Sequence, residues 1–403
     1  MSELQVLKNI SNLNILCIGD IMLDRFVYGK VNRISPEAPV QVLNLQETKE
    51  ILGGCGNVVA NLESLGCKTT YLGIVGQDLN GRKIANLLKR IESNYKLLKL
   101  KEYSTIVKTR FIAGNNHILR LDEEKKLPLV KPLLPKFERI LQKAIKSADI
   151  ILLSDYNKGI FTPESTQMII NLCKKYNKKV IIDPKGKDYR KYQGATFVKP
   201  NLKEFKEATG LEFSPTDKDF DSKIKKGAKF LFDNCKIENL LVTMSEHGIL
   251  LVTSKDKNNI IKLPTLAKEV FDVSGAGDTT IATFTLALAL GLDVTIAMKL
   301  ANTAAGIVVG KLGTACVTQE ELLATFTNKK HKFNHKDKIK TVDELLPLLS
   351  ALRKSKKIIG FTNGCFDLMH LGHLNSFAEA KKHCDILVVG INTDASIKRY
   401  KGD

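Results

Sequence analysis

The chain contains no tryptophan, and aromatic residues make up only 6% of its 403 residues. Proteins that bind single-stranded nucleic acid stack bases on aromatic side chains within basic grooves, and the sequence shows no alternation of aromatic and basic residues. The net charge of +19 arises from 62 Lys and Arg against 43 Asp and Glu, mostly as scattered lysine. We therefore interpret the charge as solvated surface that attracts phosphorylated small molecules, and expect no nucleic-acid partner.

Paired cysteine motifs and long apolar runs are also missing. The eight cysteines include no CxxC pair and mostly lie in apolar or Gly-rich segments, which is typical of reduced thiols in a cytosol. The first twelve residues lack a basic start followed by an apolar core, and no window reaches the roughly 18 apolar residues that a membrane span requires. These absences favour a cytoplasmic protein without a membrane partner.

Short apolar runs that suit strands alternate with helical patterns along most of the chain. The expected strands are 15–18, 70–75, 150–153, 180–182 and 240–243. The expected helices are 56–65, 81–91, 137–147 and 163–176. This alternation predicts an α/β fold in which helices cover a mostly parallel sheet.

The length of the chain predicts more than one domain. We expect a first domain over 1–327, a lysine-rich linker over 328–340 and a second α/β unit over 341–403. Within the first domain, the alternating segment 25–47 contains prolines and predicts antiparallel strands outside the main sheet. Together with 103–122 it is expected to form a lid.

The stretch Asp272–Thr279 is the most informative part of the sequence. Its glycines allow successive backbone N–H groups to point at one spot, before an apolar helix expected over 280–290. Gly275, Ala276 and Gly277 are therefore expected to form an anion hole. Asp278 would repel a phosphate, which suggests that it takes a proton from an attacking hydroxyl. An N-capping aspartate is the alternative interpretation.

Further polar side chains follow expected strands, where ligands collect in open α/β sheets. Asn201 and Glu204 come after the strand-like 196–198 and suit a hydrated Mg²⁺ on nucleotide phosphates. Asp183 also ends a strand, although a turn-forming Asp-Pro explains it equally well. Near the N-terminus the groups that suit a sugar are Asp20, Asp24, Gly53, Gly54 and Asn57.

Two motifs for phosphate binding are absent. Gly306–Leu312 is one residue short of a P-loop and lacks its Ser or Thr, and the turn at Gly275 lacks the third glycine of a dinucleotide fingerprint. The segments Asp20–Asp24, Gly53–Asn57, Asn201–Glu204 and Gly275–Asp278 instead occur in the order seen in ribokinase-like sugar kinases. The chain resembles that family from residue 12 to about 325.

Longer strings make the resemblance more specific. Arg33–Val40, Ser154–Gly159 and Ala305–Thr314 are similar to the D-glycero-D-manno-heptose 7-phosphate kinases. The resemblance implies a three-layer domain with a small β lid, ATP and Mg²⁺ as cofactors, Asp278 as the base, and Glu204 contacting the metal through water. It also implies ATP-binding residues, namely Asn201, Leu202, Lys203, Glu204, Thr243 and Asn302. The candidate cations for the substrate phosphate are Arg33, Arg110, Arg120 and Lys185.

The second unit contains an HxGH motif. Thr362–His373 follows an expected strand, 357–361, and precedes an expected helix, 374–383. Imidazoles at this spacing suit ATP phosphates at a helix start, and a zinc site is the less favoured alternative because no complete ligand set follows. The unit resembles the HxGH nucleotidyltransferases, specifically the adenylyltransferase half of bifunctional heptose kinases. The residues implied to bind ATP are Asn363, Phe366, Asp367, His370, Gly372 and His373.

Only two strands are expected in this second unit, 357–361 and 386–391, which are too few to bury both faces of a nucleotide-binding sheet. We therefore expect it to be truncated or degenerate. The resemblances together imply an ATP-dependent kinase that phosphorylates C1 of a heptose 7-phosphate, which is a phosphosugar. They also imply a homodimer. The alternatives are a kinase for another sugar, or a non-catalytic protein that binds ATP or a phosphosugar.

Overall fold

The computed structural model of the protein describes residues 7–114, 116–125, 129, 131–257, 259–266, 270–311, 315–327, 339–354, 357–364, 366 and 371–392. The chain divides into two compact units, Met1–Thr327 and Asn328–Asp403. The predicted linker lies mostly outside the described residues. No helix in the described part of the chain has both the length and the apolar character needed to cross a bilayer.

The first unit is built on one large sheet. Among the described residues this sheet has nine strands, ordered β13-β12-β11-β10-β9-β8-β1-β4-β5, and only β12 and β13 run antiparallel to their neighbours. The strand bounds are β1 (Asn14–Gly19), β4 (Lys68–Gly76), β5 (Asn94–Leu100), β8 (Ile150–Ser154), β9 (Val180–Asp183), β10 (Phe197–Val198), β11 (Asn239–Thr243), β12 (Ile249–Thr253) and β13 (Ile260–Leu263). All five expected strands are present, with ends shifted by no more than two residues.

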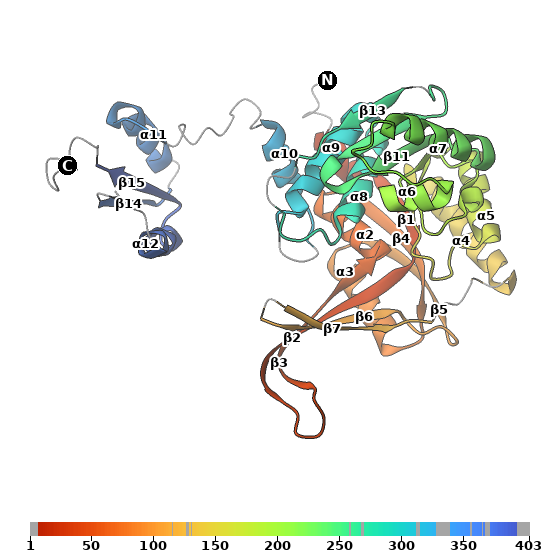
Figure 1. The fold of residues 1–403 in the computed structure, drawn as a ribbon, viewed down its shortest axis with the longest axis horizontal. Helices are drawn as coiled ribbons and strands as arrows, with labels where there is room; N and C mark the ends of the chain where they lie inside the picture. Colours follow the sequence, from red (N-terminus) through yellow and green to blue (C-terminus); the bar gives the residue numbers. More distant parts are fainter. Residues whose placement is uncertain are drawn as a thin grey trace. The chain divides into compact units, whose positions relative to one another are not determined.

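Helices cover both faces of this sheet (Figure 1). Successive residues of β1 point into two different apolar cores, Leu16 and Ile18 into one and Ile15 and Cys17 into the other. The first core is closed by α4 (Leu134–Ser147), α5 (Pro163–Lys175), α6 (Leu202–Thr209) and α7 (Phe220–Cys235). The second is closed by α2 (Cys55–Ser64), α3 (Leu79–Arg90), α8 (Ala276–Ala289), α9 (Val294–Val308) and α10 (Gln319–Thr327). Short 3-10 turns are η1 (Leu7–Asn12), η2 (Lys131–Leu133), η3 (Tyr189–Tyr192) and η4 (Ser245–His247). The predicted three-layer α/β architecture is confirmed.

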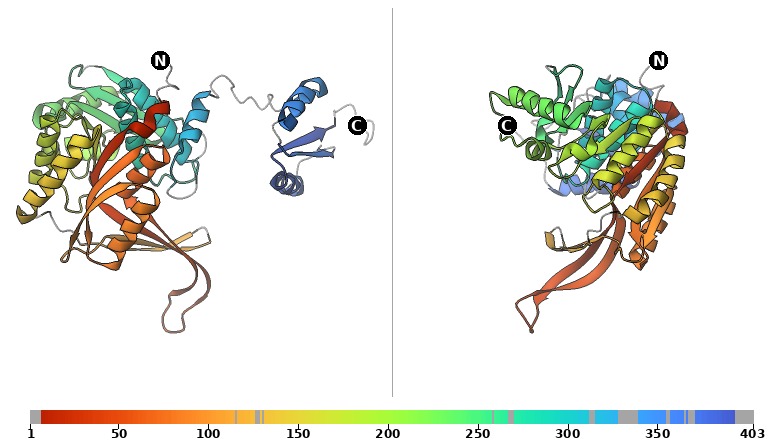
Figure 2. Two further views of the ribbon diagram at one scale, coloured as in Figure 1. Left: turned by 180° about the vertical axis from the view of Figure 1, so that it is seen from behind. Right: turned by 90° about the vertical axis from the view of Figure 1, so that its right-hand side faces the viewer.

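A second sheet forms the lid, and its strand order is β3-β2-β6-β7. Its strands are β2 (Ile21–Ile34), β3 (Gln41–Gly54), β6 (Val107–Ala113) and β7 (Asn116–Glu123). Figure 2 shows the long β2–β3 hairpin extending away from the body of this unit. Because β2 starts two residues after β1 ends and pairs with β3 as far as Gly54, both ends of the hairpin lie at the carboxyl end of β1, an interior strand of the main sheet.

The second unit contains two strands and two helices among its described residues. They are α11 (Val342–Lys354), β14 (Ile359–Gly364), α12 (Leu371–Lys382) and β15 (Ile386–Ile391). The two strands pair in parallel, with Ile359 opposite Ile386. A strand–helix–strand crossover of this kind is the basic element of a nucleotide-binding α/β domain.

Candidate active site

The first turn of α8 is the centre of the site. Gly275 is the N-cap of α8 in a left-handed conformation, with φ of 85°, which glycine adopts without strain. From Asp278 to Leu288 every residue of α8 is buried, so this part of the helix is enclosed by its neighbours on all sides. The amides of the first turn have no acceptor within the helix and point toward its N-terminus, although that of Ala276 donates to the carbonyl of Val273 at 3.2 Å.

Asp278 does not cap its own helix. Its carboxylate is only 9% exposed and accepts two hydrogen bonds from elsewhere, from Asn57 Nδ2 to Oδ2 at 2.7 Å and from the Tyr156 hydroxyl to Oδ1 at 2.8 Å. Burial raises the pKa of Asp278, while the two hydrogen bonds oppose that shift. The capping interpretation is therefore wrong, because Gly275 holds the N-cap position and the carboxylate is turned to other partners.

Asn57 reaches Asp278 because α2 and α8 pack side by side. Asn57 lies on the first turn of α2, and Asn61 one turn later donates to the Asn57 backbone carbonyl at 2.9 Å. Thr279 donates to the Asn61 side-chain oxygen at 2.9 Å, which ties the two helices together next to the carboxylate. Asn61 Nδ2 is also 3.4 Å from Asn57 Oδ1, which orients the Asn57 amide so that its nitrogen donates to Asp278.

A buried cation lies beside the phosphate turn. Lys199 is 3% exposed, and its Nζ is 3.0 Å from Asp183 Oδ1. The same Nζ is 3.7 Å from the point where a Cβ would stand on Gly277, so it lies next to the first turn of α8. Burial raises the pKa of Asp183 to about 7, although the positive charge of Lys199 opposes this shift. A buried ammonium group needs a negatively charged partner. Asp183 is one such partner of Lys199, and a transferred phosphate would be a second.

The expected nucleotide segment is a capping box at the start of α6. The Asn201 side chain accepts from the Glu204 backbone at 2.8 Å, and Glu204 Oε2 accepts from the Asn201 backbone at 3.0 Å. Glu204 Oε1 is paired with Lys185 Nζ at 2.7 Å. Asn201 also lies beside Thr243 through an isolated β-bridge, so both end at the same sheet edge.

These residues fit a hydrated magnesium ion. Both oxygens of Glu204 already accept one hydrogen bond each, and each retains a lone pair that can accept from a water molecule of such an ion. The described residues contain no cluster of three or more His, Cys, Asp or Glu that would enclose a metal. Mg²⁺ commonly keeps its waters and binds with substrate phosphates, so the site is compatible with an ion that arrives with the nucleotide.

Replacing Glu204 with Gln tests the carboxylate charge while keeping the helix cap. Glutamine also completes a capping box, so we expect the free energy of unfolding to change by less than about 1 kcal/mol. Without the carboxylate, the Mg²⁺ concentration for half-maximal activity is expected to rise roughly 10- to 100-fold. A magnesium titration of initial rates measures this. Glu344→Gln, which removes the charge from another capping box at the start of α11, is the control and should leave the titration unchanged.

The remaining predicted ATP-binding residues are spread around this edge. Leu202 packs against the first core, whereas Lys203 is exposed. Asn302 of α9 is 6% exposed and donates to the Pro264 carbonyl at 2.6 Å. Asn302 therefore braces the segment after β13, and a contact with nucleotide stays a prediction.

The lid residues divide into two groups. Asp24 is paired with Arg110 at 2.7 Å, and a Cβ on Gly53 would come within 2.4 Å of the Asp24 carboxylate, so glycine allows the close approach of β3. Gly54 has φ of 60° and is the N-cap of α2. These residues lie where the lid joins the main sheet.

The two other arginines lie farther along the lid. Arg120 faces Arg110 across the β6–β7 pair but is bound to Asp122 at 2.9 Å and is largely exposed. Arg33 stands nine residues beyond Asp24 on β2, which is roughly 30 Å along an extended strand. The structure therefore does not bring Arg33 to Asp278 within one chain, because the hairpin extends away from the sheet.

The carboxylate of Asp20, which the sequence predicts to bind sugar, accepts hydrogen bonds from backbone amides. Its carboxylate accepts from the amides of Tyr156 and Lys158, both at 3.0 Å, and more distantly from Ile160 at 3.5 Å. Asp20 is 5% exposed, and burial raises its pKa to about 6. The structure shows that this carboxylate holds the loop after β8, and a sugar contact by Asp20 stays a prediction.

In the second unit the described part of the HxGH segment is an aromatic cluster. Phe366 packs edge-on against His373 at 5.2 Å and against Phe377 at 4.9 Å. Asn363 is the second-last residue of β14 and is exposed, and Gly372 lies on the first turn of α12. Asp367 and His370 lie outside the described residues.

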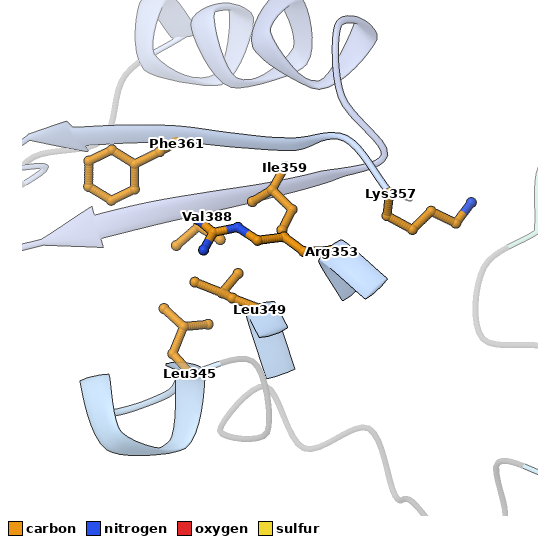
Figure 3. A pocket seen from close by; sticks show the side chains of 7 residues that line it. All are labelled: Leu345, Leu349, Arg353, Lys357, Ile359, Phe361 and Val388. Atoms are coloured by element: carbon orange, nitrogen blue, oxygen red, sulfur yellow. The ribbon is translucent and has the colours of Figure 1, made fainter. Parts of the chain in front are cut away.

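Figure 3 shows a groove between α11 and the two-stranded sheet of this unit. It has a volume of about 390 Å³ and is lined by Leu345, Leu349, Arg353, Lys357, Ile359, Phe361 and Val388. None of these belongs to the HxGH segment. The groove is therefore separate from the predicted nucleotide contacts of the unit.

Sequence analysis missed two residues of the site, Tyr156 and Lys199. Tyr156 is the second residue after β8 and Lys199 the first after β10, at the carboxyl ends of the strands, where ligands collect in this class of fold. The signal was therefore present in the sequence. Their side chains were not singled out because the pairing of Tyr156 with Asp278 joins residues 122 positions apart.

A buried carboxylate at a helix N-terminus, a buried lysine beside that helix turn and a β lid are the arrangement of a sugar kinase of the ribokinase-like class. The pfkB family of carbohydrate kinases matches residues 12–321, and a cytidylyltransferase-like family matches residues 361–402. The chain belongs to the pfkB carbohydrate kinases and, over nearly its whole length, to the bifunctional proteins named HldE. It is thus a kinase joined to a nucleotidyltransferase domain.

Individual relatives give the extent of this similarity. Bifunctional protein HldE of Aliarcobacter butzleri is 42% identical over 391 residues, 97% of this chain and 80% of that protein. The HldE protein of Campylobacter fetus is 43% identical over 394 residues, 97% of this chain and 82% of that protein.

Solved structures share the fold of the first unit. Phosphofructokinase-2 from Escherichia coli in complex with potassium has a TM-score of 0.66 at 19% identity, covering 79% of this chain and 100% of that one. Ribokinase from Arabidopsis thaliana complexed with ribose and ATP has a TM-score of 0.60 at 17% identity, covering 80% of this chain and 99% of that one.

Proposed function

We propose that the first domain transfers the γ-phosphoryl group of ATP to the C1 hydroxyl of D-glycero-D-manno-heptose 7-phosphate. The observation that carries the proposal is the Asp278 carboxylate, oriented by Asn57 and Tyr156 beside the helix amides. The choice of heptose is supported by the resemblance of Arg33–Val40 and Ser154–Gly159 to heptose 7-phosphate kinases, and by relatives named HldE.

The chemistry follows from these positions. The C1 oxygen attacks the γ-phosphorus while its proton passes to Asp278, and ADP leaves with the bridging oxygen. The first-turn amides of α8 stabilise charge on the transferred group. Glu204 would hold a magnesium ion through water, which would neutralise charge on the nucleotide phosphates. Arg110, Arg120 and Lys185 are proposed to face the substrate 7-phosphate. Lid closure would exclude water, which would otherwise accept the phosphoryl group.

Substrate comparison tests this proposal. ADP release is measured with heptose 7-phosphate, fructose 6-phosphate and ribose, and kcat/KM is expected to be about 100-fold or more higher for the heptose. An equal or higher value for either of the others would assign the site to a different sugar. Tight binding of ATP and phosphosugar with no ADP release would instead indicate a non-catalytic binding protein.

For the second domain we propose adenylyl transfer to heptose 1-phosphate. The sugar phosphate oxygen attacks the α-phosphorus of ATP, pyrophosphate leaves, and ADP-heptose forms, a precursor for lipopolysaccharide core. The proposal is supported by the cytidylyltransferase-like match over 361–402 and by the aromatic packing of Phe366 on His373. Pyrophosphate release with heptose 1-phosphate tests it independently of the kinase.

We also propose that two chains pair through the lid, in the cytoplasm. The lid exposes large apolar side chains that a second copy would cover, and such a surface is unusual on a lone subunit. These side chains are Ile34, Leu45, Ile118, Leu119 and Leu121. The seven described cysteines are all free thiols, as expected in a reducing compartment. Sedimentation of the whole chain over a range of concentrations tests the pairing.

A further inference from the structure

Tyr156 contacts Asp278, but its backbone is held in position by other residues. Tyr156 donates its hydroxyl to Asp278 Oδ1 at 2.8 Å, and it lies in the loop directly after β8. The two oxygens of Asp278 are thus bound differently, Oδ2 by the amide of Asn57 and Oδ1 by a phenol. A carboxylate oxygen has two lone pairs, so Oδ1 or Oδ2 can still accept a substrate hydroxyl.

The loop that carries Tyr156 is held at several points. Asp20 accepts its backbone amide at 3.0 Å, and the same carboxylate accepts the amide of Lys158. Asp155, the preceding residue, is 4% exposed and accepts from Asn157 at 2.6 Å, from the Tyr192 hydroxyl at 2.7 Å and from Lys191 Nζ at 2.5 Å. Because two buried carboxylates hold this loop, the position of the Tyr156 backbone does not depend on its bond to Asp278.

We propose that Tyr156 is a positioning residue for the reaction, which orients the Asp278 carboxylate and keeps it ionised for attack. This inference rests on the proposed kinase function. A phenol at its ordinary pKa donates a hydrogen bond but is not the group that takes up the proton. Burial and the neighbouring charge of Asp278 raise the pKa of Tyr156 well above its usual range, so it stays a donor.

Asp278 needs such donors because its surroundings favour the protonated form. Burial is the largest cause that raises the pKa of Asp278, and the hydrogen bonds from Asn57 and Tyr156 are the largest that lower it. The polar and titratable groups around it come from several elements: Cys55 and Asn57 of α2, Tyr156 after β8, Lys199 after β10, Asp183 of β9, Asp24 of β2 and Cys316 before α10.

The test is Tyr156→Phe, which keeps the ring and removes the donor. Loss of a hydrogen bond to a charged group is expected to move the acid limb of kcat/KM upward by roughly one to two pH units. The KM for ATP is expected to stay within about twofold, because the phenol faces the base rather than the nucleotide. The measurement is the initial rate of ADP release with heptose 7-phosphate, taken from about pH 5 to about pH 9.

Tyr189→Phe is the matched control. Tyr189 is 1% exposed, and its hydroxyl has no hydrogen-bond partner in the described part of the protein. Removing that hydroxyl tests the general cost of losing a buried phenol oxygen, and the pH profile should not move. Thermal unfolding of both variants shows whether a loss of rate comes from loss of fold.

A second substitution works in the opposite direction. Tyr156→3-fluorotyrosine makes the phenol a stronger donor without removing it, so the acid limb should move to lower pH. A purely structural Tyr156 would leave the acid limb fixed in both variants, and that result would overturn the proposal. If the wild-type protein released no ADP with any sugar, the proposed function itself would fail. If wild type were active and Asp278→Asn inactive while Tyr156→Phe kept the wild-type profile, only the positioning role would fail.

Discussion

Asp278→Asn is expected to lower kcat for ADP release by roughly 10²- to 10⁴-fold, the usual contribution of a positioned general base. The amide keeps the size of the carboxylate, and its single oxygen can still accept from Asn57 or from Tyr156, but it has no negative charge with which to take the proton. ATP binding is expected to be largely retained, because the α8 amides are unaffected. Initial rates and an ATP titration by calorimetry measure the two effects separately.

The control for this prediction is another aspartate at a helix start. Asp293 accepts from the Thr295 amide at 2.8 Å and caps α9. Asp293→Asn should therefore change stability slightly, since asparagine caps as well as aspartate, and leave kcat unchanged. Turnover by Asp278→Asn equal to that of Asp293→Asn would mean that Asp278 has no role as a base.

Lys199→Met is expected to lower kcat by roughly 10²- to 10³-fold, in the range found when one preorganised electrostatic donor is removed. Methionine keeps much of the buried stem but removes the charge that lies beside Gly277 and Asp183. If Lys199 meets the transferring phosphoryl group, the loss should appear in kcat more than in the KM for ATP.

The alternative is that Lys199 only neutralises Asp183. The double variant Lys199→Met with Asp183→Asn removes both charges, so recovery of kcat in it would support that alternative and contradict a direct role. Lys206→Met, which loses a pair with the exposed Glu212, is the control and should change kcat by less than about twofold.

Lys199→Met is also expected to change how the stability of the protein depends on pH. Because burial raises the pKa of Asp183 to about 7, the folded protein binds this proton more tightly than the unfolded chain does. The stability linked to that proton is complete at low pH and is lost as the pH rises through the folded-state pKa. Without Lys199 the opposing charge is gone, so thermal unfolding of Lys199→Met should be more impaired at pH 8 than at pH 6. An equal deficit at both pH values would contradict the linkage.

Much of the fold was accessible from the sequence because its signals are local. The runs at 15–18 and 150–153 are apolar at every position, which is how a strand buried on both faces appears. Helix α8 was expected over 280–290 and begins earlier, at Ala276. Its first turn is made of small residues without apolar periodicity, so the pattern revealed only the later turns.

The candidate site was accessible only in part. The glycine turn and Asp278 are adjacent in the chain, and so are Asn201 and Glu204, so their chemistry could be inferred from spacing. The contacts of Asp278 could not, because its partners Asn57 and Tyr156 come from distant elements. Asp20 shows the same limit, since the sequence places a carboxylate at the end of β1 but does not show that backbone amides of the next loop occupy it.

By itself, the sequence determined the layered α/β architecture and pointed to the lid, the glycine turn before α8 and the candidate base Asp278, because each depends on residue type and on periodicity over a few positions. Only the tertiary structure decided which side chains meet: the tyrosine and amide on Asp278, the buried Lys199 beside Gly277, and the distance of Arg33 from the base. Those contacts depend on how strands are ordered in the sheet and where helices cross it. Neither is encoded in the spacing of the residues along the chain.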